Sequence, residues 1–347
     1  MSVRIGILGC GMITQVRHAP EYARDPRAEI ALVWDLDLAR AKQLADKYGA
    51  AVADSPEALW GSSRVDAVSV CTPNHFHGPQ TLAALAAGKH VLCEKPMASG
   101  LDEARSMVEA ARKANRLLML GHNQRFAPAH QAGRSLIAAG AIGRILSFRS
   151  HYRHGGPEKW GVNKTAATWF FDKTRTRYGV LGDLGTHKID LVRFLTGQDV
   201  AAVQAWLGTV HKTKVDGTPI DLEDEATIRL RMASGLVGTV DVSWCHYGLQ
   251  DNVTVVNGDK GVLTMNPEDP SSLVLETADG VLQRQTFGHP WGSAQDGSGV
   301  IREFLDALEA GRQPLVTGLD GLAAVEVIEA SITSAASGTW QDVRHGL

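Results

Sequence analysis

Apolar and polar positions divide the chain into two parts with different rhythms. In the first third, short apolar runs alternate with amphipathic segments whose apolar residues recur every three or four positions. The short runs are apolar throughout, which is typical of parallel strands that are buried on both faces. This part of the chain therefore predicts a parallel sheet covered by helices. The expected strands are residues 3–8, 30–35, 67–72, 90–94 and 117–121.

Beyond about residue 122 the pattern changes. A long stretch at 152–180 is rich in Gly, Arg, Lys and aromatic residues, and extended segments then follow one another at hairpin spacing between residues 200 and 286. This rhythm predicts an antiparallel or mixed sheet. Since 347 residues exceed the usual size of one domain, we expect two domains, 1–122 and 123–347. The helices expected in the second part are 128–139, 187–195, 300–310 and 319–334.

Composition and charge exclude several classes of partner. The formal net charge is −3 and no long basic block occurs, so nucleic acid and anionic membranes are not expected partners. No apolar run approaches the roughly 18–20 residues that a membrane-spanning helix needs, and no secretory signal opens the chain. The cysteines, Cys10, Cys71, Cys93 and Cys245, show no C-x-x-C spacing. We expect a protein of the reducing cytoplasm.

A glycine turn follows the first expected strand. Gly9 and Gly11 come directly after residues 3–8, and a helix is expected to open near Met12 and Ile13. In this context Gly9 allows a tight turn, Gly11 lets the backbone approach a pyrophosphate, and the first N–H groups of the helix bind the phosphates. The third fingerprint position holds Thr14, a β-branched residue that we expect to loosen the helix–strand packing. The turn predicts a dinucleotide site.

Asp35 ends the second expected strand, where a carboxylate accepts hydrogen bonds from the adenosine ribose hydroxyls. It would repel a 2′-phosphate, and its neighbour Leu36 offers no cation, so NAD is favoured over NADP. A further strand ends in the sequence CTPNHFH, which is expected to flank the nicotinamide half of the cofactor. The residues concerned are Thr72, Pro73, Asn74 and His77.

Three side chains far apart in the sequence can handle a proton while a hydride leaves. Asp183 and His187 are four residues apart at the start of a helical pattern and can face the same side. A histidine is suited to accept the proton of a hydroxyl. Lys95 ends a strand on the same rim as the glycine turn and can stabilise an alkoxide. Each of these features alone is more often structural, so the prediction depends on their combination with the glycine turn.

The remaining histidines, the aromatic residues and three arginines carry weaker indications of function. The remaining histidines show no spacing typical of a metal site, and we predict no catalytic metal. Aromatic residues at 152–178, Trp169 among them, can stack on a sugar ring, although core packing is the commoner role. Arg153, Arg175 and Arg177 suggest a polar or anionic group on the substrate.

These motifs resemble those of the Gfo/Idh/MocA oxidoreductases, which include glucose–fructose oxidoreductase and inositol dehydrogenase. The resemblance covers nearly the whole chain. It rests on GILGCGMIT at 6–14, CTPNHFH at 71–77, CEKP at 93–96, GHNQRF at 121–126 and GDLGTHKIDL at 182–191.

The family implies an α/β protein with two domains. Residues 1–122 would form a Rossmann domain with a doubly wound parallel sheet, and residues 123–347 a substrate-binding α/β domain. The second domain would carry a large, open, mainly antiparallel sheet that often mediates contacts between copies in a homo-oligomer.

The resemblance also implies roles for individual residues. His187 resembles the acid/base and Lys95 a residue near both nicotinamide and substrate, with Asp183 completing the catalytic group. Glu94 and Lys95 of the EKP motif and Asn123 and Arg125 at the domain junction are expected near the cofactor. The expected substrate contacts are Lys95, Arg153, Trp169, Asp183 and His187.

The sequence thus predicts an NAD-dependent dehydrogenase acting on a secondary hydroxyl of a cyclic sugar or an inositol-like polyol. A reductase of a keto-sugar or imine would use the same residues and stays an alternative. A dinucleotide-binding regulator is a weaker alternative, because such a protein could lose the acid/base group that this chain keeps. The segments expected to set the substrate are 151–178 and 287–299.

Overall fold

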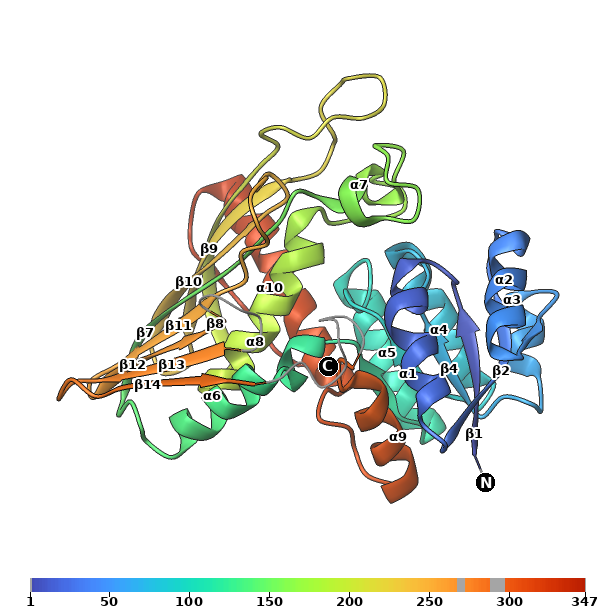
Figure 1. Cartoon of the computed structure of the whole chain (residues 1–347). Coiled ribbons are helices and arrows are strands. Elements are labelled where there is room, and N and C mark those ends of the chain that lie inside the picture. Colours follow the sequence, from blue (N-terminus) through green and yellow to red (C-terminus); the bar gives the residue numbers. More distant parts are fainter. Residues whose placement is uncertain (1, 267–271, 288–296, 347) are drawn as a thin grey trace.

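A computed structural model describes residues 2–266, 272–287 and 297–346. Most of the expected segment 287–299 lies outside these described residues. The first part of the chain forms a six-stranded parallel sheet of order β3-β2-β1-β4-β5-β6, in which β1 and β4 are central (Figure 1). Its strands are β1 (Val3–Leu8), β2 (Ala28–Trp34), β3 (Ala51–Val52), β4 (Ala67–Val70), β5 (His90–Cys93) and β6 (Leu118–Leu120).

Helices cover both faces of this sheet, as the alternating pattern predicts. Helix α2 shows the local reasons: the Asp37 side chain caps its start by accepting from Arg40 N, and Gly49 ends it in the left-handed conformation. The predicted doubly wound parallel sheet is confirmed. The helices are α1 (Ala19–Arg24), α2 (Leu38–Tyr48), α3 (Pro56–Gly61), α4 (His77–Ala86) and α5 (Leu101–Ala114), with short helical turns η1 (Thr14–His18), η2 (Asn74–Phe76) and η3 (Asn123–Phe126).

The second part forms a nine-stranded sheet of order β14-β13-β12-β11-β7-β10-β9-β8-β15. Its pairs are antiparallel except for β7 and β10, so the sheet is mixed and mainly antiparallel, as expected. The strands are β7 (Ile145–Arg153), β8 (Val200–Gly208), β9 (Glu225–Met232), β10 (Val237–Ser243), β11 (Thr254–Gly258), β12 (Gly261–Met265), β13 (Ser272–Thr277), β14 (Leu282–Thr286) and β15 (Gln341–Asp342).

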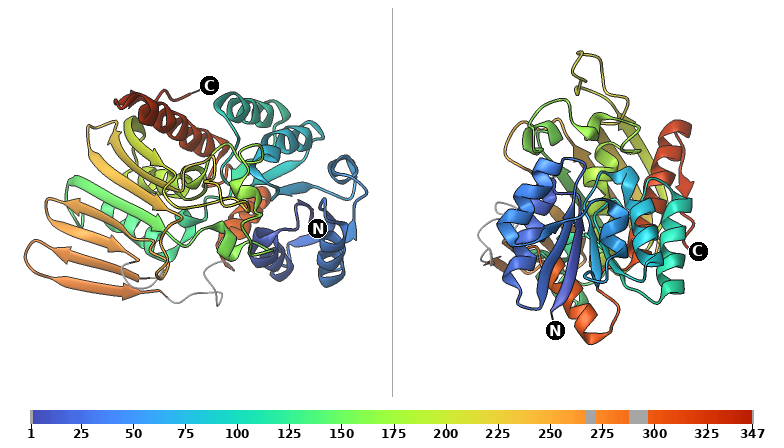
Figure 2. Two further views of the ribbon diagram at one scale, coloured as in Figure 1. Left: turned by 90° about the horizontal axis from the view of Figure 1, so that it is seen from above. Right: turned by 90° about the vertical axis from the view of Figure 1, so that its right-hand side faces the viewer.

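One face of the large sheet is buried and the other is open. In β9 buried and exposed residues alternate strictly, with Ile228 and Leu230 in the core and Arg229 and Arg231 outside. Helices α8 and α10 lie between the large sheet and the N-terminal part of the molecule (Figures 1 and 2). The helical segments of this part are α6 (Pro128–Ala138), α7 (Pro157–Trp160), η4 (Trp169–Phe171), η5 (Leu181–Gly185), α8 (Thr186–Thr196), α9 (Val300–Ala310) and α10 (Gly318–Ser337).

The end of the chain returns to the N-terminal sheet. The apolar face of α9, including the fully buried Phe304, belongs to the same core as Ile5 and Ile7 of β1. The start of α10 contributes Leu322 and Val325 to the core on the other face. A boundary at residues 122 and 123 therefore separates the two sheets but not all of the helices that cover them.

Candidate active site

The first glycine turn has the shape that a pyrophosphate needs. Gly9 has a φ of +89°, and a Cβ there would lie 2.7 Å from the carbonyl oxygen of Cys71, so both conformation and space require glycine. A Cβ on Gly11 would meet nothing within 4 Å, so its backbone is open to an approaching group. Met12 and Ile13, both partly buried, begin the helix that follows. These residues fit the phosphates of a dinucleotide.

Thr14 is well accommodated at the third fingerprint position. Its side chain is fully buried, and its hydroxyl donates a hydrogen bond to the carbonyl oxygen of Gly9. The chain passes here through the wide helical turn η1. The threonine therefore closes the glycine turn, and the loosened packing that we expected from its β-branch is not seen.

Asp35 lies against the glycine turn, directly after β2. Its Oδ2 accepts from Cys10 N at 2.7 Å and its Oδ1 from Asp37 N at 2.8 Å. Arg40 Nη1 lies 3.4 Å from the same carboxylate. The carboxylate therefore stands where ribose hydroxyls are bound in Rossmann domains. Arg40 is a nearby cation that the local sequence around Leu36 did not indicate.

The CTPNHFH segment is held mainly by its own hydrogen bonds. The His77 ring lies between the carbonyl oxygens of Thr72 and Pro96, at 2.8 Å from each. Thr72 donates to the side-chain oxygen of Gln80, and Asn74 donates to the hydroxyl of Thr176 in the second part of the chain. His77 thus links the end of β4 to the EKP motif, and Asn74 links the two halves of the molecule. Pro73 is partly buried beside them.

Glu94 makes contacts that sequence reasoning missed. Its carboxylate accepts from His18 Nε2 at 2.9 Å and from Arg17 Nη1 at 3.2 Å, both on the turn η1. Burial opposes ionisation of Glu94, but the His18 hydrogen bond and the Arg17 charge hold its pKa well below its usual range. Glu94 therefore anchors the EKP motif to the first helical turn as a carboxylate.

Lys95 and Asp183 meet, as the sequence predicts. Lys95 Nζ lies 2.8 Å from Asp183 Oδ1 and 3.0 Å from the Asp183 carbonyl oxygen. The other carboxylate oxygen accepts from Trp244 Nε1 at 3.0 Å. Asp183 is 5% exposed, so this ion pair is shielded from water. Trp244 was not among the expected site residues, since a tryptophan at the end of a strand carries no chemical signal in sequence.

The wide turn η5 places Asp183 and His187 on one side. Within it, a Cβ on Gly182 would lie 2.4 Å from Tyr178 Cβ, and a Cβ on Gly185 would lie 2.8 Å from Leu181 Cδ1. Since Gly185 has an ordinary helical φ of −61°, this glycine is required for space and not for an unusual conformation.

His187 is buried beside Lys95. Burial and the Lys95 charge lower the pKa of His187 well below its usual value, so its imidazole is neutral near pH 7. Its Nδ1 is buried without a hydrogen-bond partner in the protein, which leaves Nε2 for a ligand. A neutral imidazole beside an ammonium is suited to accept a proton from a hydroxyl that the ammonium binds.

The residues of the GHNQRF motif differ in their surroundings. Arg125 is bound in the junction: Nε and Nη2 donate to Asp190 at 2.8 and 2.6 Å, and Nη2 also donates to Asp320 at 2.8 Å. Asn123 is partly buried, and its Oδ1 has no partner within the protein. The structure therefore gives Arg125 a structural role, while Asn123 keeps a free acceptor.

Aromatic side chains continue from Asp183 towards the 152–178 segment. Trp169 stacks on Phe170 at 3.8 Å between ring centroids, and Phe170 lies edge-on to Trp244 at 6.3 Å. Arg153 ends β7, and its Nε is buried without a partner in the protein. Tyr152 of the same strand lies 6.0 Å from the His187 ring. Phe170 and Trp244 thus connect Trp169 to Asp183, and Tyr152 lies beside His187.

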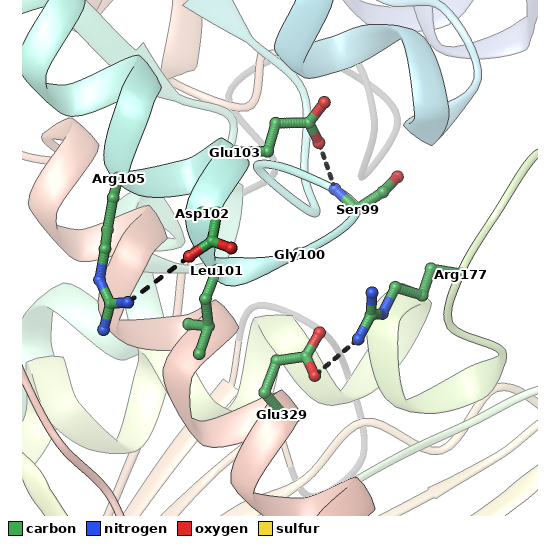
Figure 3. Close-up of a pocket in the computed structure, with 8 residues that line it drawn as sticks. All are labelled: Ser99, Gly100, Leu101, Asp102, Glu103, Arg105, Arg177 and Glu329. Atoms are coloured by element: carbon green, nitrogen blue, oxygen red, sulfur yellow. Dashed lines mark hydrogen bonds and ion pairs between the residues drawn. The ribbon is translucent and has the colours of Figure 1, made fainter.

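A cavity of about 470 Å³ lies away from these residues, at the start of α5 (Figure 3). Arg177 forms an ion pair there with Glu329 of α10 at 2.9 Å, and Asp102 lies 3.9 Å from Arg105. Arg177, which the sequence suggested for substrate contact, therefore belongs to the junction of α5 and α10.

The described residues hold neither a candidate membrane span nor a candidate metal cluster. Among residues 2–266, 272–287 and 297–346, no helix combines the length and apolar character needed to cross a membrane. In the same part of the chain, no three His, Cys, Asp or Glu side chains gather so as to hold a metal ion.

Comparison with known proteins identifies the family. Residues 3–122 match the oxidoreductase family with an NAD-binding Rossmann fold, and residues 130–264 match the GFO/IDH/MocA C-terminal domain. A levoglucosan dehydrogenase from Pseudarthrobacter phenanthrenivorans is 30% identical over 316 residues, which is 80% of each chain. A 1,5-anhydro-D-fructose reductase from Ensifer adhaerens is 33% identical over 298 residues, or 84% of each chain.

A solved structure has the same fold as this chain over nearly its full length. Levoglucosan dehydrogenase in complex with NADH and levoglucosan has a TM-score of 0.91 and 27% identity, covering 99% of this chain and 100% of that chain. The fold, the glycine turn and the sequence relatives lead to the same assignment. The chain belongs to the Gfo/Idh/MocA family of NAD-binding oxidoreductases.

Proposed function

We propose that this oxidoreductase is a dehydrogenase that oxidises a secondary hydroxyl of a cyclic sugar or an inositol-like polyol. One observation carries the proposal: Lys95 and Asp183 form a shielded ion pair beside a buried, neutral His187. Lys95 follows strand β5 at the C-terminal edge of the parallel sheet. Asp183 on η5 contacts it there, and His187 lies in the next turn, on α8. Parallel sheets bind their ligands at that edge.

Each residue has a distinct role in this proposal. Bound NAD supplies the acceptor for the hydride. Lys95 Nζ donates a hydrogen bond to the substrate oxygen and stabilises negative charge as it develops there. His187 Nε2 accepts the hydroxyl proton. Asp183, held by Trp244, directs the Lys95 ammonium, since a buried ammonium needs a paired carboxylate.

The residues around the glycine turn and at the ends of the neighbouring strands would bind the two halves of the dinucleotide. Gly9 and Gly11, with the first helical N–H groups at Met12 and Ile13, would hold the pyrophosphate, and Asp35 the adenosine ribose. Thr72, Pro73, Asn74, His77, Glu94, Lys95 and Asn123 would surround the nicotinamide half, with Arg125 supporting them from the junction.

The substrate class rests on the relatives and on the aromatic side chains near Asp183. The relatives include a levoglucosan dehydrogenase and an anhydro-sugar reductase, both acting on cyclic sugars by their names. Trp169 and Arg153 would line the sugar site, the ring faces stacking on apolar C–H groups. The reductase name keeps the reverse direction as a second candidate. A regulator without catalysis is disfavoured because Lys95, Asp183 and His187 are all present and assembled.

We also propose a cytoplasmic homo-oligomer that assembles through the open face of the large sheet. Trp206 of β8 is 52% exposed and pairs with Thr227, which faces outward on β9. An exposed tryptophan on an open sheet is typical of a contact surface. All four cysteines are free thiols, which suits a reducing compartment. Sedimentation of the wild type and of Trp206→Glu tests the contact, which the acidic variant should weaken.

A panel of sugars, anhydro-sugars and inositols tests the proposed activity. The full chain is mixed with each compound and NAD or NADP, and the absorbance of reduced nicotinamide is followed. The proposal expects turnover with at least one cyclic secondary alcohol and a preference for NAD. Binding of NAD with no turnover on any member, in either direction, would reject it in favour of a regulator.

A further inference from the structure

His122 is a second buried imidazole beside His187. It follows β6 directly, is 1% exposed, and its ring centroid lies 6.5 Å from that of His187, with the planes at 82°. Neither of its ring nitrogens has a hydrogen-bond partner in the protein. The mechanism above gives His122 no role.

A buried imidazole without partners needs a physical reason. Every neutral imidazole carries one N–H and one acceptor nitrogen, and leaving such a buried group unpaired costs free energy. Among the buried atoms of the described residues that have no protein partner, four more lie in the same segment as His122 or beside His187: Asn123 Oδ1, Gln124 Oε1, Thr186 Oγ1 and His187 Nδ1. This concentration of unpaired atoms indicates a polar site that holds ordered water.

His187 also lacks a hydrogen-bond partner for Nδ1 in this region. To accept a proton on Nε2, its resting proton must sit on Nδ1, and that N–H requires an acceptor. Catalytic histidines are generally held in this tautomer by a group bound to the other nitrogen. Here Nδ1 is buried and has no protein partner. Asp183, the nearest catalytic carboxylate, is already engaged by Lys95 and Trp244.

We propose that His122 is the positioning residue that fixes the tautomer of His187, acting through one water molecule between His187 Nδ1 and a ring nitrogen of His122. This inference rests on the proposed dehydrogenase function. The water accepts the Nδ1–H of His187 and donates to the acceptor nitrogen of His122. The ring separation of 6.5 Å excludes a direct hydrogen bond and fits one bridging water.

The surrounding charges are consistent with a neutral pair. Burial lowers the pKa of His122, on which the charges of Asp190, Arg125, Asp320 and Lys95 also act. The two carboxylates of this group are both bound by Arg125. The His122 ring therefore stays neutral near pH 7 and keeps the acceptor nitrogen that the bridge requires.

His187 faces a different set of charges. Besides Lys95 and His122, the charges acting on it come from Arg17 and from the fully buried Lys188. All of these groups are cationic when protonated, and burial lowers the pKa of Lys188 to about 7. Within the described part of the chain no carboxylate is hydrogen-bonded to His187 Nδ1, and the neutral His122 ring lies 6.5 Å away, centroid to centroid.

Nitrogen NMR of the full-length protein, labelled with ¹⁵N only in histidine, tests the proposal without any substrate. The resonances are assigned by comparison with His187→Asn and His122→Phe. In the wild type at pH 8, His187 should be predominantly protonated on Nδ1. In His122→Phe the tautomers should mix, while in His122→Gln, whose amide oxygen can accept from the same water, the Nδ1 form should persist. An Nε2-protonated His187 in the wild type, or an unchanged tautomer in His122→Phe, overturns the proposal.

His130→Gln is the matched control. His130 is equally buried, but its Nδ1 is bound to the Gln124 carbonyl oxygen at 2.8 Å and its Nε2 to Asn266 at 3.2 Å. This variant should leave the His187 tautomer unchanged, and a change would show that any buried histidine loss disturbs His187, which also overturns the proposal. If His122→Phe does not fold, His122→Leu replaces it.

Activity provides a second measurement once a substrate is known. His122→Phe should lower kcat about tenfold or more with little change in the Kd for NAD, and His122→Gln should recover most of that loss. Failure of the wild type on the whole sugar panel would reject the proposed function, whereas the tautomer measurement would still decide the role of His122.

Discussion

At the scale of single residues, the role that a charged side chain can have in the site depends on the hydrogen bonds and ion pairs it already makes within the protein. Lys95 and Asp183 bind each other, and Trp244 holds the carboxylate. Arg125, by contrast, has its donors bound by carboxylates of α8 and α10. Residue type alone does not tell a charged residue that contacts a ligand from one that forms a structural ion pair.

Lys95→Met and His187→Asn should each lower kcat/KM by about 10²–10⁴-fold, because one removes the group that stabilises the alkoxide and the other the base. Steady-state kinetics with the best sugar of the panel measures the loss, and the Kd for NAD should change little. Lys89→Met is the control, since Lys89 donates to the carbonyl oxygens of Ser62 and Val65 away from this group. Near-normal turnover in both site variants would contradict the assignment.

Asp35→Ala should shift the cofactor preference towards NADP by roughly tenfold, equivalent to about 1.4 kcal/mol. The change removes a carboxylate that repels a 2′-phosphate and one of the two ion pairs of Arg40, at 3.4 Å, while the pair of Arg40 with Asp37 at 3.0 Å remains. The ratio of kcat/KM for the two cofactors measures it. Asp46→Ala, which removes an exposed ion pair with Lys42 on the same helix, should leave the ratio unchanged; an unaltered ratio in Asp35→Ala would refute the role of Asp35.

At the scale of elements, the segment η5 that leads into helix α8 is held by neighbouring residues. The Glu223 carboxylate accepts from Gly179 N at 2.8 Å and Leu181 N at 3.2 Å, and the Glu223 carbonyl oxygen accepts from Val180 N at 2.9 Å. A Cβ on Gly179 would lie 2.1 Å from that carbonyl oxygen, so the close approach requires glycine. Glu223 thus caps the segment that carries Asp183 and His187.

This cap predicts a pH dependence. Burial raises the pKa of Glu223 to about 7, above its value of 4.5 in the unfolded chain, so its contribution to stability is lost as the pH rises from 4.5 to 7. Glu223→Gln keeps an acceptor without the charge. Its stability relative to wild type should therefore rise over this range, by the order of 1 kcal/mol per pH unit, and stay constant above pH 7. Urea unfolding at several pH values checks this, and a difference independent of pH would contradict it.

At the scale of the whole molecule, the two sheets share their covering helices. Helix α9 belongs to the end of the chain, yet Phe304 is fully buried against the core of β1. The start of α10 covers the other face of the same sheet. The cores on both faces of the N-terminal sheet therefore include residues from the end of the chain, which follow strand β14 in sequence.

Phe304→Ala should lower the free energy of unfolding by about 3–5 kcal/mol, since it leaves a cavity in a close-packed core. Because that core supports β1 and the glycine turn, NAD should raise the Tm of the variant as it does that of the wild type, but from a lower starting value. Differential scanning with and without NAD measures both. Leu319→Ala, 54% exposed on α10, is the control, and equal losses in the two variants would contradict the packing argument.

The sequence by itself determined the architecture and the family. Uniform apolar runs such as 67–72 predicted buried parallel strands, the hairpin spacing between residues 200 and 286 predicted an antiparallel or mixed sheet, and both were confirmed. These features are visible because local periodicity reports burial directly. The glycine turn after β1 was equally clear, since Gly9 has a φ of +89°, a conformation that favours glycine.

Only the tertiary structure decided which polar groups meet. Glu94 with His18, Asp183 with Trp244, and His122 with His187 are pairs separated by 61 to 76 residues. No periodicity connects such residues, because their contact depends on how two sheets and the helices between them pack. The return of α9 to the first sheet was hidden for the same reason: an amphipathic stripe shows that a face is buried, and not what buries it.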